Sequence, residues 1–530
     1  MSRKRILRAL AAVVLAAFAA SLLTGCGVPA EESAAPAQTA SPASPTPAIA
    51  PSGGAEKRDG VFTLNYHPDY NLNPFTCDSE INRQLCCLLF EPLVAVTPDF
   101  QPEPALCTAW DSEDGWVFTL TLRENAQFTD GTALSFWDVL YSLNRAMESG
   151  SVYAERLRCV QSVEQVEGRV VITLKEPNPS FPLRLELPVV KEGSAYLDLP
   201  TGTGPYVLAE GEGYQYLRAS ETWPGADSLP LGRIYLENYP MEEVSAAFDA
   251  SFLDLAVTEG GNGALFHTGV QADRHAASTS ILYYLGVNWA GEALADPARR
   301  RLVASAIDRQ SAAAILGGDA ALLPVSPATA YYDGAIARRW LAEDLTAYGI
   351  EILTEDYDGD GYREYLADGE QRDFLLRLLV CEENPVSLAA ARSLAADLEA
   401  AGIQVRLQAL DLSGYRAALK SRDYDLYFAS MRLSADFDLS SLLCPGGAAY
   451  PSGGDGELAA LTEAFRAAAL PDRMEAAKAL YDRVAETCPL IPLAFGRRTV
   501  VTLRGAVSGL DPSWTNPFLH LTSWRVTLDG

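Results

Sequence analysis

A strand, a helix and a second strand follow one another in the second half of the chain. Residues 374–380 are almost uniformly apolar, and residues 387–401 carry an apolar helical stripe that ends at Gly402. Residues 403–407 then alternate between apolar and polar side chains. Two strands joined by one helix pair in parallel through a right-handed crossover. The sequence therefore predicts an α/β region here, with a further strand at 426–429.

The first half of the chain has a different pattern, with short strands and few helices. Residues 116–122 alternate like a half-buried strand, and residues 160–174 are typical of a hairpin. Ser135 and Asp138 form a Ser-x-x-Asp capping box before a helical apolar stripe. Near the C-terminus, residues 456–487 are expected to form two helices. We predict mixed α and β structure throughout.

The N-terminus indicates export. A basic start is followed by an apolar run at 9–23, too short to span a bilayer comfortably, and by small residues before Cys26. This order resembles a bacterial lipoprotein signal, although an ordinary signal peptide or membrane anchor with a chance cysteine is the alternative. The resemblance implies a signal peptide at 1–25 and a lipidated Cys26 that begins a flexible tether at 26–58. The protein would then be held at the outer face of the cytoplasmic membrane.

Composition excludes several classes of protein. The chain is 48% hydrophobic and 21% charged, which is unlike a disordered chain, a coiled coil or a polytopic membrane protein. Its net charge of -28 repels phosphate backbones, so we expect no nucleic-acid partner. The nine cysteines and four histidines form no metal-ligand spacing of the zinc type. The sequence leaves disulfide pairing open.

Several short motifs occur in a fixed order along the chain. They are Leu89-Phe90-Glu91-Pro92-Leu93, Phe128-Thr129-Asp130-Gly131-Thr132, Asp138-Val139-Leu140-Tyr141-Ser142, Gly202-Thr203-Gly204-Pro205-Tyr206, and Val287-Asn288 followed by Arg299. Together they resemble the family 5 extracytoplasmic solute-binding proteins, the peptide- and nickel-type binding proteins of ABC importers. The resemblance extends from about residue 61 to the C-terminus.

The resemblance implies a two-lobed, flytrap-like α/β fold of the type II periplasmic-binding-protein class, with mixed sheets and a ligand cleft between the lobes. Lobe I would comprise residues 59–277 plus 490–530, and lobe II residues 278–489. The implied function is capture of an extracellular solute, above all oligopeptides, by closing lobes and delivery to a membrane permease with its ATPase. We expect a monomer.

Asp436 is the principal candidate for ligand binding. The resemblance implies that it takes the α-ammonium group of a peptide, and a charge-assisted hydrogen bond suits that role. The alternative is a solvated loop or helix-cap aspartate. Further candidates for the cleft, several of which could equally be core or turn residues, are Asn288, Trp289, Tyr284, Phe437, Arg432, Thr203 and Phe75.

An acidic, glycine-containing segment is the most metal-like part of the chain. Asp356, Asp358 and Asp360 alternate as in an EF-type calcium loop, and Glu364 falls at position 9. Position 12 is Ala367, so the bidentate glutamate is missing. A structural calcium ion is one interpretation, and a plain turn before a strand is the other. We predict no other cofactor.

Three other functions remain open at this stage. A surface receptor that reports a peptide signal could use the same fold, and family members with sugar or metal-chelate cargo also occur. An extracellular enzyme would need a catalytic constellation. The sequence contains no nucleophile elbow, phosphate-binding loop or HExxH motif, so we predict no catalytic residue and no enzymatic activity.

Overall fold

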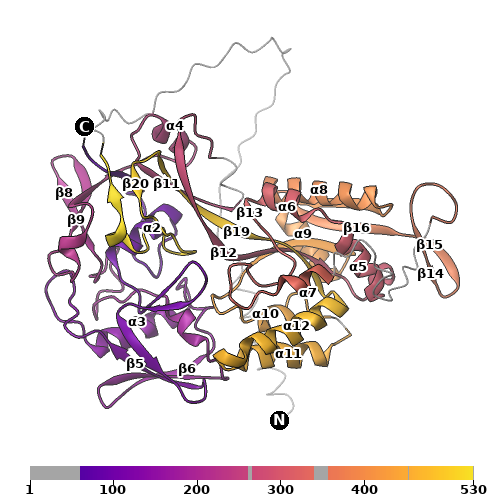
Figure 1. The fold of residues 1–530 in the computed structure, drawn as a ribbon, viewed down its shortest axis with the longest axis horizontal. Coiled ribbons are helices and arrows are strands. Elements are labelled where there is room, and N and C mark those ends of the chain that lie inside the picture. The colour runs from indigo at the N-terminus through magenta and orange to yellow at the C-terminus, as the bar shows by residue number, and fades with distance from the viewer. Residues whose placement is uncertain (1–59, 261–265, 340–355, 452, 529–530) are drawn as a thin grey trace, which may run out of the picture. The chain divides into compact units, whose positions relative to one another are not determined.

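The computed structural model describes residues 60–260, 266–339, 356–451 and 453–528. The predicted signal peptide, Cys26 and the tether up to residue 58 lie outside these residues. Mixed α and β structure is found throughout the described chain (Figure 1). No helix among the described residues is long and apolar enough to cross a membrane.

Two four-stranded sheets belong to the first half of the chain. One has the order β1 (Thr63–Asn65), β10 (Arg233–Glu237), β9 (Tyr214–Ala219) and β8 (Tyr206–Gly211). The other has the order β4 (Cys107–Asp111), β5 (Val117–Leu122), β7 (Arg169–Leu174) and β6 (Val160–Val166).

Local sequence signals explain the second of these sheets. Phe118 and Leu120 of β5 are buried as the alternation predicts, but Trp116 precedes the strand and is 41% exposed. The hairpin of β6 and β7 is confirmed and turns at Glu167 and Gly168, both with positive φ. The capping box is also confirmed, since the Asp138 carboxylate accepts from the backbone N of Ser135 at 2.9 Å and begins α3 (Phe136–Met147).

A seven-stranded sheet contains the predicted parallel unit. Its order is β11 (Leu255–Glu259), β19 (Leu490–Leu503), β12 (Ala272–Val287), β18 (Leu426–Arg432), β16 (Leu375–Cys381) and β17 (Gln404–Leu410), with β13 (Gly318–Ala320) also paired to β19. β16 pairs in parallel with β17 and β18, and α8 (Pro385–Ala400) connects β16 to β17. The strand–helix–strand prediction is therefore confirmed.

Helices cover both faces of this sheet, as expected for a parallel sheet. Leu378 and Val380 of β16 belong to one core cluster with residues of α6 (Arg309–Leu316) and α8. Leu379 belongs to another core cluster, with residues of α11 (Gly456–Ala467) and α12 (Arg473–Thr487). Figure 1 shows α6 and α8 on one side of the sheet and α11 and α12 on the other.

β12 and β19 form a long antiparallel ribbon that links the two predicted lobes. Residues 272–278 of β12 pair with 497–503, beside β11, and residues 282–286 pair with 490–495, beside β18. The register shifts between Ser278 and Leu282. There the buried Thr279 hydroxyl donates to the carbonyl of Gly496 at 2.8 Å. The predicted lobe boundaries fall on this ribbon and stay predictions.

The remaining elements are shorter or lie around the sheets. The helices are α2 (Glu80–Leu89), α4 (Val244–Asp249), α5 (Pro297–Ala306), α7 (Gly334–Arg339), α9 (Leu412–Ser421) and α10 (Ser440–Leu443). The strands are β2 (Val94–Val96), β3 (Pro102–Pro104), β14 (Glu364–Ala367), β15 (Glu370–Asp373), β20 (Val507–Ser508) and β21 (Arg525–Val526).

Candidate functional site

A cavity of about 670 Å³ lies between residues of the two predicted lobes. This volume is in the range of small-ligand pockets. From lobe I the cavity is lined by Val152, Glu155, Arg156, Arg158, Cys159, Lys175, Glu176, Asn178, Arg184 and Trp514. From lobe II it is lined by Arg432, Leu433, Ser434, Asp438, Ser440, Ser441 and Arg466.

A buried ion-pair network lies beside this cavity and joins the two lobes. Nε of Arg184 lies 2.8 Å from Oδ2 of Asp436, and its Nη2 lies 2.8 Å from Oδ2 of Asp438. The side-chain amide of Asn178 donates to the same Asp436 oxygen at 2.6 Å. Asp436 is fully buried, with 0% exposure, and its Oδ1 has no hydrogen-bond partner among the described residues.

Charge compensation keeps this network ionised. Burial alone would raise the pKa of Asp436, but the positive charge of Arg184 and the hydrogen bonds to the carboxylate hold that pKa below its ordinary value. Burial would likewise lower the pKa of Arg184, and the nearby Asp436 raises it above the ordinary value instead. Asp436 is therefore a carboxylate that already has a cationic partner.

A second arginine ties the same loop to lobe I. Arg473, the first residue of α12, donates through Nη1 to the hydroxyl of Ser180 at 2.6 Å and through Nη2 to the carbonyl of Asp436. Its guanidinium lies 4.3 Å from the ring centroid of Phe465. The loop after β18 is thus held both by Arg184 of lobe I and by Arg473 of lobe II.

Comparison with known proteins identifies the family to which this architecture belongs. The family model described as bacterial extracellular solute-binding proteins, family 5 Middle, matches residues 101–447, more than half of the chain. The chain belongs to this family. The resemblance seen in the sequence motifs is confirmed.

Curated family 5 relatives are distant. Protein XP55 of Streptomyces lividans is 28% identical over 344 residues, which cover 60% of this chain and 61% of that protein. Di/tripeptide-binding protein 2 of Pseudomonas aeruginosa is 24% identical over 395 residues, which cover 64% of this chain and 70% of that protein. The match to XP55 thus spans about three fifths of the relative's length.

Solved structures support the same architecture. The crystal structure of a nickel ABC transporter from Bacillus halodurans has a TM-score of 0.71 with this chain at 21% sequence identity, and the match covers 88% of this chain and 100% of that one. The predicted two-lobed, mixed α/β fold of family 5 is confirmed.

The structure places the predicted ligand residues in three different environments. Of these residues only Arg432 lines the interlobe cavity, where Asp438 also lies. Asp436 is buried against Arg184, so in this conformation it offers no free carboxylate to a ligand's ammonium group. Binding of a peptide's ammonium group by Asp436 therefore stays a prediction, and it would require Arg184 to release the carboxylate.

Three other predicted residues are core residues in this conformation. Phe437 is fully buried, with its ring 4.9 Å from that of Phe100. Phe75 is fully buried against Tyr153. The hydroxyl of Thr203 accepts from the backbone N of Glu91 at 3.3 Å. None of the three lines the cavity.

The last three predicted residues lie near a separate cavity of about 400 Å³ in lobe II. Tyr284, Asn288 and Trp289 line this cavity. Tyr427 of β18 also lines it. Tyr427 is five residues, or about 17 Å along the strand, from Arg432, which lines the interlobe cavity. The amide of Asn288 donates to the carbonyl of Tyr424 at 2.9 Å and so fixes a loop. These residues do not form the floor of the interlobe cavity.

The cations of lobe I that line the cavity were not found by sequence reasoning. Arg156 and Lys175 lie on turns flanking the β6–β7 hairpin and Arg184 lies in a short 3-10 helix at Phe181–Leu185, all outside the family motifs. A lone arginine or lysine on a loop usually indicates a solvated surface. They converge through long-range contacts within lobe I, such as Nη1 of Arg184 to the carbonyl of Arg156 at 3.4 Å, which no local sequence pattern indicates.

A buried glutamate lies behind this wall. The hydroxyl of Thr515 donates to Glu186 at 2.5 Å, and Arg156 donates to the Glu186 carbonyl at 2.6 Å. Burial raises the pKa of Glu186 to about 7, against the opposing charge of Arg156. This carboxyl group therefore titrates near neutral pH.

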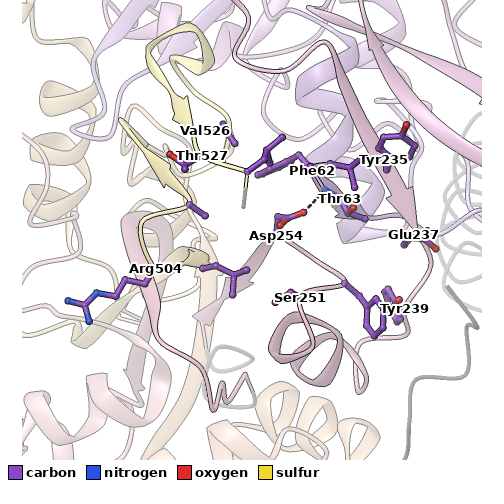
Figure 2. Close-up of a pocket in the computed structure, with 16 residues that line it drawn as sticks. Phe62, Thr63, Tyr235, Glu237, Tyr239, Ser251, Asp254, Arg504, Val526 and Thr527 are labelled. Carbon is purple, nitrogen blue, oxygen red and sulfur yellow. Dashed lines mark hydrogen bonds between the residues drawn. The ribbon is translucent and has the colours of Figure 1, made fainter. Parts of the chain in front are cut away.

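A third, smaller cavity of about 110 Å³ lies where the described chain begins (Figure 2). Asp254 accepts from the backbone N of Thr63 at 2.7 Å and so fixes β1 against the turn that precedes β11. Figure 2 shows Arg504 extending away from the other labelled residues. The size and these internal contacts fit a structural packing gap better than a solute site.

The acidic loop brings four carboxylates together. Ligand oxygens of Asp356, Asp358, Asp360 and Glu364 all lie within 4.8 Å of one another. Glu364 is 4% exposed and accepts from the backbone N of Tyr357 at 2.8 Å. Among the described residues the loop leads into the β14–β15 hairpin. The carboxylates also accept from backbone amides of the loop, as in a plain turn, so calcium binding stays a prediction.

Proposed function

We propose that this chain is the substrate-binding component of an ABC importer. It captures an extracellular solute, an oligopeptide, between its two lobes and delivers it to a membrane permease with an attached ATPase. The observation that carries the proposal is the cavity of about 670 Å³ between lobes that a single ribbon, β12 and β19, connects. Membership of family 5 supports the same function.

The proposed mechanism is ligand-dependent closure. A ligand favours the closed state only to the extent that it binds that state more tightly than the open one. The register shift between Ser278 and Leu282 gives the connecting ribbon a place to bend, because ladder hydrogen bonds are interrupted there. A micromolar dissociation constant, about -8 kcal/mol, would allow both capture and release.

Membership of family 5 supports a binding function without catalysis, and this support does not depend on the absence of particular residues. Family 5 comprises solute-binding proteins, so we assign no catalytic role to the ionisable groups of the cavity. The ion pairs of Arg184 with Asp436 and Asp438 hold residues of the two predicted lobes together.

We also propose that the protein is lipidated on Cys26 and held outside the cytoplasmic membrane. The order of basic residues, apolar run and cysteine supports this, as does the extracellular character of the family. A Cys26→Ser variant should move from the membrane fraction to the soluble exported fraction. Retention on the membrane would contradict the lipid anchor.

Structural calcium at the acidic loop is a separate proposal. Three alternating aspartates and a buried glutamate supply the oxygen ligands that calcium prefers. The ion would stabilise the loop before β14, away from the cavity residues.

The test of the main proposal is mass spectrometry of whatever denaturation releases from the gently purified protein. A set of short peptides is the expected result. A protein sample stripped of ligand and refolded serves as the blank. Release of a single sugar or metal chelate would overturn the peptide cargo, and absence of both released ligand and peptide-induced thermal stabilisation would overturn the binding function.

A further inference from the structure

The interlobe cavity has a charge opposite to that of the chain around it. Acidic residues outnumber basic ones by 69 to 41 in the whole sequence. Among the residues that line the cavity, six are basic and only three, Glu155, Glu176 and Asp438, are acidic. Such a local excess of cations concentrates and orients anions.

Four of the six cations are already paired. Arg184 binds Asp436 and Asp438, Arg432 lies 2.9 Å from Glu259, and Arg158 lies 3.4 Å from Glu155. The fourth, Arg466, is paired with Glu176. Arg156 and Lys175 form no ion pair within 4.0 Å of any carboxylate among the described residues. They are therefore the two cations free to receive a ligand.

Arg156 is held in place by two rings and a backbone carbonyl, and the nearby Glu186 carboxyl group interacts with its charge without forming an ion pair. Its guanidinium lies 5.3 Å from the ring centroids of both Tyr153 and Trp514, and Nη1 donates to a backbone carbonyl. Lys175 is anchored similarly, since Nζ donates to the carbonyl of Arg158 at 2.7 Å. A preorganised cation loses less entropy when it binds an anion than a mobile one does.

Among the described residues, the carboxylates that line the cavity already have cationic partners: Glu155 pairs with Arg158, Glu176 with Arg466 and Asp438 with Arg184. The Asp436 carboxylate is fully buried and paired with Arg184, which holds the position that the family resemblance gave to a peptide's ammonium group. Asp438 is paired with the same guanidinium.

From this geometry we infer that the cavity selects peptides by their carboxylates, with Arg156 and Lys175 as the receiving groups, and that acidic peptides are its preferred cargo. The inference rests on the proposed peptide-binding function and names the class of peptide. Charge-assisted hydrogen bonds from two cations provide the selectivity.

Calorimetric titration with three N-acetylated tetrapeptide amides tests this inference on the full mature protein. The peptides differ only at their two central positions, which are both glutamate, both glutamine or both lysine. We expect the glutamate peptide to bind at least tenfold more tightly than the glutamine peptide, and the lysine peptide to bind most weakly. The preference should diminish as salt is raised.

Variants assign the effect to the two cations. R156Q and K175Q should each reduce the glutamate preference several-fold, whereas Arg156→Lys should retain most of it. The matched controls R169Q and K420Q change exposed cations outside the cavity and should leave it unchanged. Thermal unfolding shows whether each variant still folds. If R156Q does not fold, the glutamate preference of Arg156→Lys is compared with that of the unmodified protein instead.

The outcomes separate the inference from the proposed function. Equal binding of all three peptides, or a glutamate preference that survives in the R156Q/K175Q double variant, would overturn the inference but keep peptide binding. Failure of any peptide to bind, free or acetylated, would overturn the peptide function itself.

Discussion

Arg184 lies 2.8 Å from Asp436, although the two residues are 252 positions apart in the sequence. The same guanidinium binds Asp438, so one lobe I side chain holds two carboxylates of the loop that follows β18. This buried arginine, together with Arg473, therefore fixes the β18 loop of lobe II against lobe I.

Replacement of Arg184 should be strongly destabilising. Arg184→Gln leaves Asp436 as a buried carboxylate without a cationic partner, and we expect the free energy of unfolding to fall by about 3–5 kcal/mol. Urea denaturation measures this change. R169Q, on an exposed position of β7, should change it by about 0.5 kcal/mol or less. A double variant, Arg184→Met with Asp436→Leu, should recover much of the lost free energy of unfolding. If this double variant is as unstable as Arg184→Gln, the unpaired Asp436 carboxylate is not the cause of the instability.

Asp436→Asn distinguishes the family expectation from the structure. If Asp436 receives a peptide's ammonium group, the variant should lose affinity for a free-amine peptide and keep it for the acetylated form. Because Asp436 is paired with Arg184, we expect the variant to change the affinity for the two forms by the same factor, whether that factor is large or small. Calorimetric titration of the two peptides against both proteins is the measurement. A loss of tenfold or more that is confined to the free amine would show that Arg184 gives way to the ligand.

Glu186 should make stability depend on pH. Burial raises its pKa from 4.5 to about 7 in the folded protein, so the folded state binds a proton that the unfolded state releases. Its contribution to stability is fully present below about pH 4.5 and is lost as pH rises through about 7, a change of roughly 3 kcal/mol.

Comparison of E186Q with the unmodified protein isolates this effect. The difference in their free energies of unfolding should increase in favour of E186Q between pH 4.5 and 7.5. E210Q, at an exposed position of β8, should show no such trend. A pH-independent difference for E186Q would mean that folding does not raise the pKa of Glu186.

Calcium should raise the melting temperature if the acidic loop binds it. Calcium at 100 times its dissociation constant adds about 2.7 kcal/mol to the free energy of unfolding. D358N and D360N should abolish the shift because each removes a charged ligand. D368N is the control, since Asp368 lies in the β14–β15 turn with φ of 51°, which asparagine tolerates. Equal melting temperatures in calcium and in chelator would contradict calcium binding at the acidic loop.

Local patterns predicted the elements well because each depends on residues close together in sequence. The α8 stripe, the capping box before α3 and the turn at Glu167 and Gly168 are short-range signals. The parallel pairing of β16 and β17 followed from chain geometry alone.

The cavity could not be predicted in the same way. Its wall combines Arg156 and Lys175 with Arg432, more than 250 residues later, and no local pattern links them. Asp436 was found through its family context, but its partner was not, because Arg184 has no motif of its own. Tyr284 and Asn288 were assigned to the cleft from their position at the start of lobe II, whereas Tyr284 pairs with Ala429 in the middle of β18 and Asn288 lies beside the start of that strand, at a separate cavity.

The position of β19 also affects how the chain can fold. This strand is among the last parts of the protein to be synthesised, yet it lies between β11 and β12 in the sheet. Until residue 490 and those after it emerge, the two flanking strands have no neighbour between them, and the ribbon shared by both lobes cannot form. Completion of this sheet is therefore delayed until synthesis is nearly finished, although the two four-stranded sheets do not include β19. A chain truncated before residue 490 would therefore lack the strand that joins β11 to β12, so the C-terminal end of the sequence is needed to complete a sheet to which both predicted lobes contribute.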